Sequence, residues 1–153
     1  MRRSAKHGQS PQNPYQLTRI DDTPIISGAN AACGQNGNPI VASFTDDDAI
    51  MWWLTDKSQA AANCVRNYLW NHPATGVTYD GHSRTLPHSG LRQIYAGQAA
   101  AKYFGVPVSG PRHPDVWGAV HVGVVYTTGT KIAEHGGANP KTAMSRSSCT
   151  PRA

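Results

Sequence analysis

The sequence predicts an α/β fold, because segments with helical spacing alternate with short apolar segments typical of strands. From Ser58 to Asn71, the apolar residues recur at helical spacing. From Val116 to Thr127, by contrast, the chain is rich in valine, as buried strands are. The 15 glycines and 11 prolines of the chain separate such segments and predict many loops.

The first predicted helix spans about Thr23 to Ala32. Asp21 and Asp22 precede it as acidic capping candidates, and Pro24 falls in its first turn, where proline is favoured. The polar, glycine-containing segment from Gly34 to Asn38 ends this helix.

Two strands are expected next, a buried one at Ile40 to Phe44 and a second at Ala49 to Leu54. The acidic run Asp46 to Asp48 between them could form a metal cluster. We favour a turn, because the run joins two apolar segments.

In the second half of the chain, Ser58 is the expected N-cap of the helix that ends at His72-Pro73. Three further elements are expected: an exposed strand or hairpin from Val77 to Thr85, an alanine-rich helix from Gln98 to Phe104 and one strand from Val116 to Thr127.

Composition and charge exclude several classes of protein. The 153 residues fit one domain or part of a larger one. The formal charge of +5 permits an anionic partner, but the basic residues are scattered and no nucleic-acid motif is present, so nucleic acid is not expected. No apolar run reaches the ~20 residues of a membrane helix. No apolar segment follows the basic start at Met1 to Ser4, so no signal peptide is recognised and the compartment stays open.

The three cysteines, Cys33, Cys64 and Cys149, show no CxxC spacing. Their odd number argues against a disulfide framework, and their spacing argues against a zinc-thiolate site. Any metal site is therefore expected to use histidines and carboxylates.

Two histidines precede glycines in loops, in Lys6-His7-Gly8 and in Glu134-His135-Gly136-Gly137. Glycine leaves room beside an imidazole, and neutral imidazole is the commonest metal ligand in proteins. Other histidines are better explained structurally: a turn for His113, solvated loops for His82 and His88, and a strand position for His121. The four tryptophans fit core packing.

The segment from Arg112 to Ala138 resembles the last part of alkaline phosphatase superfamily enzymes, most closely the type I phosphodiesterase and nucleotide pyrophosphatase branch. The likeness is carried by Arg112-His113-Pro114-Asp115-Val116, by Val124-Val125-Tyr126 and by Lys131 to Ala138. The resemblance implies a partial alkaline-phosphatase-like sheet flanked by helices, and makes His135 a ligand of one of two zinc ions.

Ser4 to Gln9 resembles the family's Asp-His-Gly motif, which makes His7 a candidate ligand of the other zinc ion. Lys6 stands where the family has a metal-binding Asp, and a protonated amine repels a cation. Either the metal is held differently here, or Lys6 contacts a substrate phosphate; a solvated loop charge is an equal alternative. The family's nucleophilic Ser or Thr, activated by metal, and several carboxylate ligands precede this motif.

The resemblance therefore implies that residues 1–140 are the C-terminal part of a hydrolase domain, inactive alone. Lys141 to Ala153 departs from the family's acidic stretch and Val-Pro-Leu strand. One coding of this tail, with a base restored near Pro140, reads Asp-Arg-Asp-Val-Pro-Leu-Val-Val-His-Ala-Thr, so a frameshifted, unstructured tail is expected.

The sequence thus predicts a fragment of a zinc-dependent hydrolase of phosphodiesters or nucleotide pyrophosphates. The alternative is a non-catalytic remnant or a stand-alone domain that binds anions or metal. Strands missing at both ends would leave unpaired sheet edges, so the isolated chain is expected to fold poorly or aggregate. Relatives are often exported, and neither substrate nor oligomeric state follows from the sequence.

Overall fold

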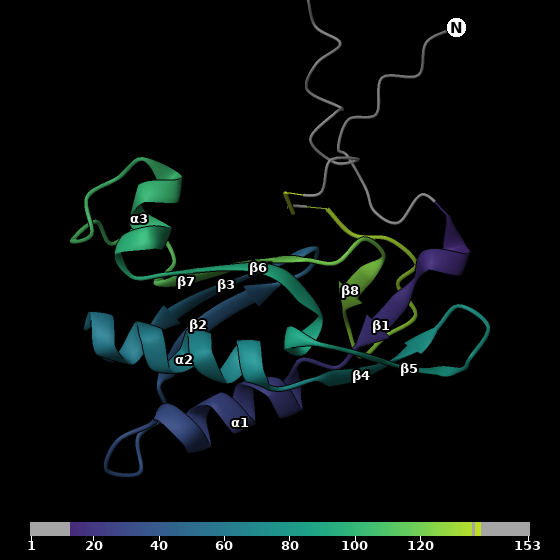
Figure 1. Ribbon diagram of the computed structural model, residues 1–153, viewed down its shortest axis with the longest axis horizontal. Helices are drawn as coiled ribbons and strands as arrows, with labels where there is room; N and C mark the ends of the chain where they lie inside the picture. The colour runs from purple at the N-terminus through teal and green to yellow at the C-terminus, as the bar shows by residue number, and fades with distance from the viewer. Residues whose placement is uncertain (1–12, 136, 139–153) are drawn as a thin grey trace, which may run out of the picture.

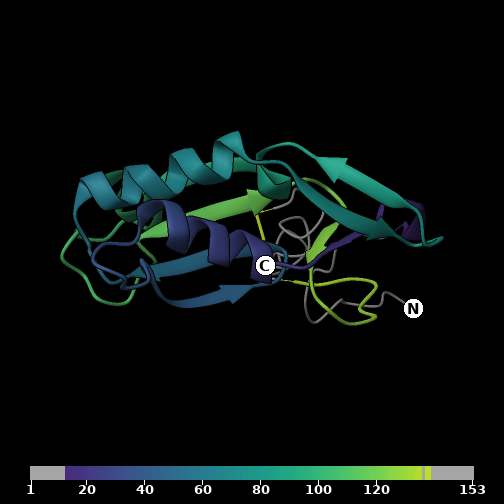
Figure 2. The same ribbon diagram turned by 90° about the horizontal axis from the view of Figure 1, so that it is seen from below.

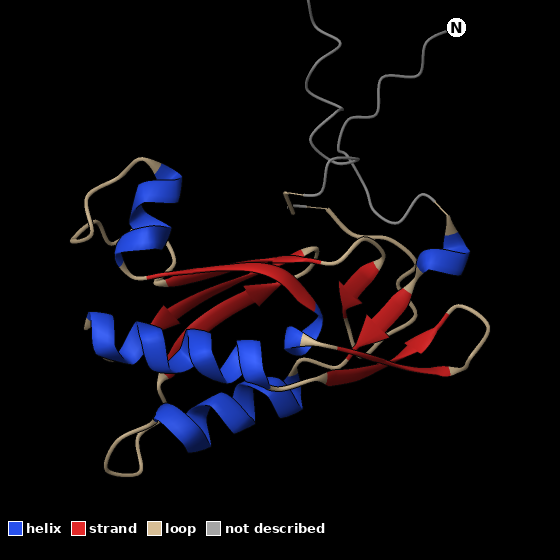
Figure 3. Cartoon of the chain, viewed as in Figure 1, coloured by secondary structure: helices blue, strands red, loops and turns tan. Residues whose placement is uncertain are grey.

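The computed structural model describes residues 13–135, 137 and 138, and they form a mixed α/β fold with two separate sheets (Figure 1). The fold class predicted from the sequence is confirmed. The expectation of one sheet is replaced by two sheets of four strands each. Figure 3 shows the strands of the two sheets side by side, with helices on both sides of one of them, described below as the second sheet.

The first sheet has the strand order β5-β4-β1-β8. Its strands are β1 (Thr18–Ile20), β4 (Ala74–Thr78), β5 (Ser83–Leu86) and β8 (Val124–Tyr126). Strand β1 pairs antiparallel with β4 but parallel with β8, with Thr18 opposite Val124. The strand or hairpin expected at Val77 to Thr85 is the β4–β5 hairpin.

The second sheet has the order β2-β3-β7-β6 and is antiparallel throughout. Its strands are β2 (Val41–Asp46), β3 (Ala49–Leu54), β6 (Leu91–Ala96) and β7 (Val116–Val120). The prediction that the β2 region is buried was wrong. Only Ile40 and Val41 are buried, whereas Ala42 to Thr45 lie along an open edge and are exposed.

Helices α1 (Thr23–Cys33) and α2 (Gln59–Asn71) cover one face of the second sheet, as Figure 2 shows from below. The side chain of Ser58 caps α2 by accepting a hydrogen bond from the Ala61 N–H at 3.1 Å, as predicted. Of the two acidic residues predicted to cap α1, Asp21 does so: its Oδ1 accepts a hydrogen bond from the Thr23 N–H at 2.9 Å.

Helix α3 (Gln98–Phe104) lies on the opposite face of the second sheet (Figure 1). It has the predicted bounds and ends at Gly105, whose φ of 67° is left-handed. Two short 3₁₀ turns, η1 (Pro14–Gln16) and η2 (His88–Gly90), complete the described elements.

The single strand predicted from Val116 to Thr127 is in fact β7 and β8, which belong to different sheets. A turn at His121 to Gly123 separates them. Gly123 has a φ of 92°, and a Cβ there would overlap the carbonyl oxygen of Gln16, so only glycine fits. His121 accordingly lies in this turn and not within a strand.

The main core lies between the second sheet and helices α1 and α2 and continues into the first sheet, and most of its side chains are aliphatic. Trp52 and Trp117 are buried as predicted, but Trp70 is 38% exposed and stacks on His88. Cys33 of α1 and Cys64 of α2 form a disulfide, which corrects the expectation drawn from the cysteine count. The number and spacing of the cysteines could not predict this bond, because the packing of α1 against α2 brings Cys33 and Cys64 together.

No helix among residues 13–135, 137 and 138 is long and apolar enough to cross a membrane. Whether the isolated chain folds stays a prediction, as does the frameshifted tail, which lies outside the described residues.

Candidate functional site

His135 is the only one of the three predicted site residues that the structure describes. It is exposed and lies after β8, in the segment formed by residues 131–135, 137 and 138, here named the His135 loop. His7 and Lys6 lie outside the described residues, so the expected role of His7 as a ligand of the other zinc ion, and that of Lys6 as a phosphate contact, stay predictions.

Ion pairs connect the start of the His135 loop to the turn between β2 and β3. Lys131 Nζ lies 3.5 Å from Asp47 Oδ1 and 3.3 Å from Glu134 Oε1. Glu134 raises the pKa of Lys131 by hydrogen bonding and charge, and Asp47 adds to this effect. The Asp47 carbonyl also accepts a hydrogen bond from the Tyr126 N–H at 3.1 Å, which fixes the same turn to β8.

Asp48, in this turn, is an unusual buried carboxyl group. It is 1% exposed, and neither carboxyl oxygen has a hydrogen-bond partner among the described residues. Burial, followed by the charges of Glu134 and Asp47, raises the pKa of Asp48 to about 7, while Arg92 lowers it. The acidic run is therefore a turn, as predicted, but one whose third carboxyl group is enclosed beneath the His135 loop.

The end of the His135 loop makes close contacts with both the turn and β6. Arg92 Nη2 on β6 donates a hydrogen bond to the Ala138 carbonyl at 2.7 Å. A Cβ on Gly137 would overlap the Asp48 carbonyl oxygen, so residue 137 must be glycine for this approach. Ala138 packs against a small cluster on the α3 side of the second sheet, which contains Ala49, Trp117 and Ala119.

His135 is exposed, and the role of zinc ligand that the family resemblance implies for it stays a prediction. The neighbouring Glu134 is already paired with Lys131. Across residues 13–135, 137 and 138, no three side chains of His, Cys, Asp or Glu are placed to hold a metal ion together.

The Arg112 to Val116 motif has a structural role in the fold. Asp115 is 7% exposed, its Oδ2 accepts a hydrogen bond from the Leu54 N–H at 2.8 Å, and its carbonyl accepts from the Gly97 N–H at 2.8 Å. His113 precedes β7 in a loop, as predicted, but is buried. This part of the family-like motif joins β3, β7 and α3.

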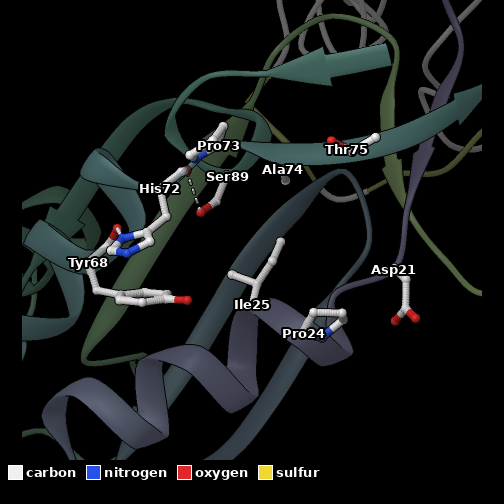
Figure 4. Close-up of a pocket in the computed structure, with 9 residues that line it drawn as sticks. All are labelled: Asp21, Pro24, Ile25, Tyr68, His72, Pro73, Ala74, Thr75 and Ser89. Carbon is white, nitrogen blue, oxygen red and sulfur yellow. Dashed lines mark hydrogen bonds between the residues drawn. The ribbon is translucent and has the colours of Figure 1, made fainter. Parts of the chain in front are cut away.

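A separate cavity of about 340 Å³ lies between α1, α2 and β4, and sequence analysis did not anticipate it (Figure 4). Its lining is Asp21, Pro24, Ile25, Tyr68, His72, Pro73, Ala74, Thr75 and Ser89.

The serine, histidine and aspartate of this cavity do not form a catalytic triad. The His72 ring stacks on Tyr68 with centroids 4.0 Å apart, and its Nδ1 lies 2.7 Å from the Tyr68 carbonyl. Ser89 Oγ donates to the carbonyls of Leu69 and His72, both at 3.2 Å. Figure 4 shows Asp21 on the other side of the cavity from His72.

Ser89 belongs to a strained turn. His88, Ser89 and Gly90 have φ values of 54°, 56° and 86°, and the first two are unusual for residues with side chains. The turn is held by the Tyr126 hydroxyl, which donates to the Ser89 carbonyl at 2.6 Å. These contacts give the strain a structural role in joining α2 to β8.

A second perturbed carboxyl group lies at the end of β2. Trp52 Nε1 donates to both oxygens of Asp46 at 2.9 Å. Burial raises the pKa of Asp46 to about 8; the Trp52 hydrogen bond opposes this shift, and the charge and hydrogen bond of Asp22 add to it. Asp46 therefore retains its proton near neutral pH.

No protein-family model, curated protein or solved structure matches this chain. Its function is therefore argued from its own residues and from the motifs of the sequence.

Proposed function

We propose that this chain is the His135-bearing part of a metal-dependent phosphoester hydrolase that acts on phosphodiesters or nucleotide pyrophosphates. The proposal rests on the Glu134-His135-Gly136-Gly137 motif and its likeness to the alkaline phosphatase superfamily. The observation that supports it best is that His135 is exposed on a loop whose flanking residues are tied to the β2–β3 turn and to β6.

Each residue of this loop has a distinct part in the proposal. His135 presents an imidazole, and Lys131 forms ion pairs with both Asp47 and Glu134 at 3.3–3.5 Å. Gly137 allows the backbone to approach the turn. A zinc ion, when bound, would supply Lewis-acid polarisation of the phosphoryl group. The Ser or Thr nucleophile and the carboxylate ligands would come from sequence outside this chain.

The decisive test reads the genomic DNA on both sides of the reading frame and then expresses the restored chain. Restoration adds the upstream codons and one base near Pro140. With zinc present, hydrolysis of bis(p-nitrophenyl) phosphate is measured for the restored protein, for His135→Ala and for His82→Ala. His82 is a matched control because its side chain is 81% exposed in the β4–β5 hairpin, away from the His135 loop.

We expect the restored chain and His82→Ala to hydrolyse the diester, and His135→Ala to lose most of the rate. Equal rates for the two histidine variants would remove His135 from the site. Flanking DNA without a nucleophile segment, together with a tail that reads no better in another frame, would favour the stand-alone alternative. That alternative predicts polyanion binding that weakens steeply with salt.

A further inference from the structure

The inference drawn here rests on the proposed function and concerns two residues far from His135 in the sequence. We infer that Arg92 and Asp48 are positioning residues for His135: they hold the His135 loop in place from beneath, one by a side-chain hydrogen bond and the other by backbone contact. Neither residue is itself expected to contact substrate.

The first contact comes from β6. Arg92 is partly buried, and its Nη2 reaches across 46 residues of sequence to the Ala138 carbonyl at 2.7 Å. A short hydrogen bond from a charged donor is stronger than one between neutral groups. It fixes the backbone three residues beyond His135 to the second sheet.

The second contact comes from the β2–β3 turn. Gly137 lies so close to the Asp48 carbonyl that no Cβ could be placed there. Asp48 cannot move away easily, because its side chain is enclosed and its neighbour Asp47 accepts a backbone hydrogen bond from Tyr126. The β2–β3 turn therefore fixes the position of the His135 loop relative to the second sheet.

The charges around these contacts compensate one another. Arg92 lies close enough to Asp48 to favour its ionised form, and Lys131 bridges Asp47 and Glu134. The positively charged Arg92 and Lys131 thus accompany the carboxyl groups of Asp47, Asp48 and Glu134. These contacts hold the backbone on both sides of His135, through Lys131 before it and Arg92 after it.

The test uses the full chain with isotopically labelled histidines and follows the ring signals of all 7 by NMR, without and with added ZnCl₂. His135→Ala assigns the His135 signal. Arg92→Met removes the hydrogen bond to Ala138, and Arg92→Lys retains one N–H donor. Arg84→Met is the matched control, because Arg84 donates to Thr18 Oγ1 at 3.1 Å in the other sheet.

We expect Arg92→Met to shift or broaden the His135 signal and to leave the other ring signals in place, except that of His121, on which the Arg92 charge also acts. Arg92→Lys should recover part of the change in the His135 signal, and Arg84→Met should leave that signal in place. An unchanged His135 signal in Arg92→Met would overturn the inference whatever zinc does.

Gly137→Ala keeps the test decisive if Arg92→Met fails to fold, because it adds one methyl group at the contact with Asp48 and leaves Arg92 intact. It should move the His135 signal in the same way, and an unmoved signal would again overturn the inference. If zinc moves no His135 signal in the wild type while both variants displace that signal, the loop contacts stand and the proposed metal role fails.

Discussion

The two faces of the second sheet differ in what they bury. The face under α1 and α2 carries the main core and has a disulfide across its two helices. The opposite face carries a smaller apolar cluster around Trp117, beside which lie the enclosed Asp48 and partly buried Arg92. Burial of apolar area stabilises a fold, whereas buried charge costs free energy unless it is compensated. The comparison suggests that the helix-covered face supplies stability and the loop face supplies the candidate site.

The largest expected effect contrasts two isoleucines. Ile50 is 1% exposed on the helix-covered face, and Ile132 is 60% exposed in the His135 loop. Ile50→Ala should lower the free energy of unfolding by about 2–5 kcal/mol, because it leaves a cavity in the core. Ile132→Ala should change it by less than about 0.5 kcal/mol. Urea unfolding of both variants gives the comparison, and equal losses would contradict it.

The disulfide should have the next largest effect. Cys33 and Cys64 are separated by 31 residues, and closing such a loop restricts the unfolded chain. Replacing both by alanine should cost about 2–4 kcal/mol. Reduced wild type should match this variant in thermal unfolding, and Cys149→Ser in the oxidised form should match oxidised wild type. A variant as stable as oxidised wild type would show that the helix pair does not need the bond.

Asp46 tests whether a buried carboxyl group at the helix-covered face lowers the stability of the fold. Because its folded pKa is about 8 against 3.8 normally, the folded state keeps a proton that the unfolded chain releases. Stability should therefore fall as pH rises from about 4 to 8. Asp46→Asn keeps an acceptor for Trp52 and removes this loss, so its advantage over wild type should grow with pH, to on the order of 2 kcal/mol at pH 9.

The control for Asp46 is Asp80, an exposed carboxylate whose pKa is lowered, chiefly by the Thr78 hydroxyl. Because its pKa is lowered, folding favours the ionised form of Asp80, which is the opposite of Asp46. Asp80→Asn should therefore gain no stability at alkaline pH. Denaturation curves at several pH values separate the two, and a gain for Asp46→Asn that is independent of pH would contradict the raised pKa of Asp46.

The smallest effect concerns the start of α2. Ser58→Ala removes the cap that accepts from the Ala61 N–H and should cost about 1 kcal/mol, whereas Ser58→Gly should cost only a few tenths. Thermal unfolding measures both. Neither change should move the His135 ring signal, since α2 covers the other face, and a displaced signal would show that the two faces are coupled.

The elements with strong local signals were predicted closely from the sequence. The bounds of β3 and α3 agree, and α1 and α2 differ from prediction by a residue at most. Local capping and periodicity decide such elements. The Val116 to Thr127 segment was misjudged because Gly123, inside a valine-rich run, was not taken as a turn.

The candidate site was predictable only in part. His135 has a local sequence motif. The residues that contact its loop, Arg92 and the β2–β3 turn, are distant in sequence and are placed next to it by the second sheet. The Asp46 to Asp48 run indicated a turn without indicating that Asp48 would be enclosed. Burial of a charged residue depends on packing between distant segments, which periodicity does not encode.

The parallel pairing of β1 with β8 has a consequence for how the chain is made. The partners Thr18 and Val124 are separated by nearly the whole described chain. During synthesis, β1 leaves the ribosome long before its neighbour exists, whereas the β2–β3 and β4–β5 hairpins can close early. The first sheet must therefore remain unfinished until residue 126 has emerged, and the His135 loop, which follows β8, can settle onto the second sheet only after that.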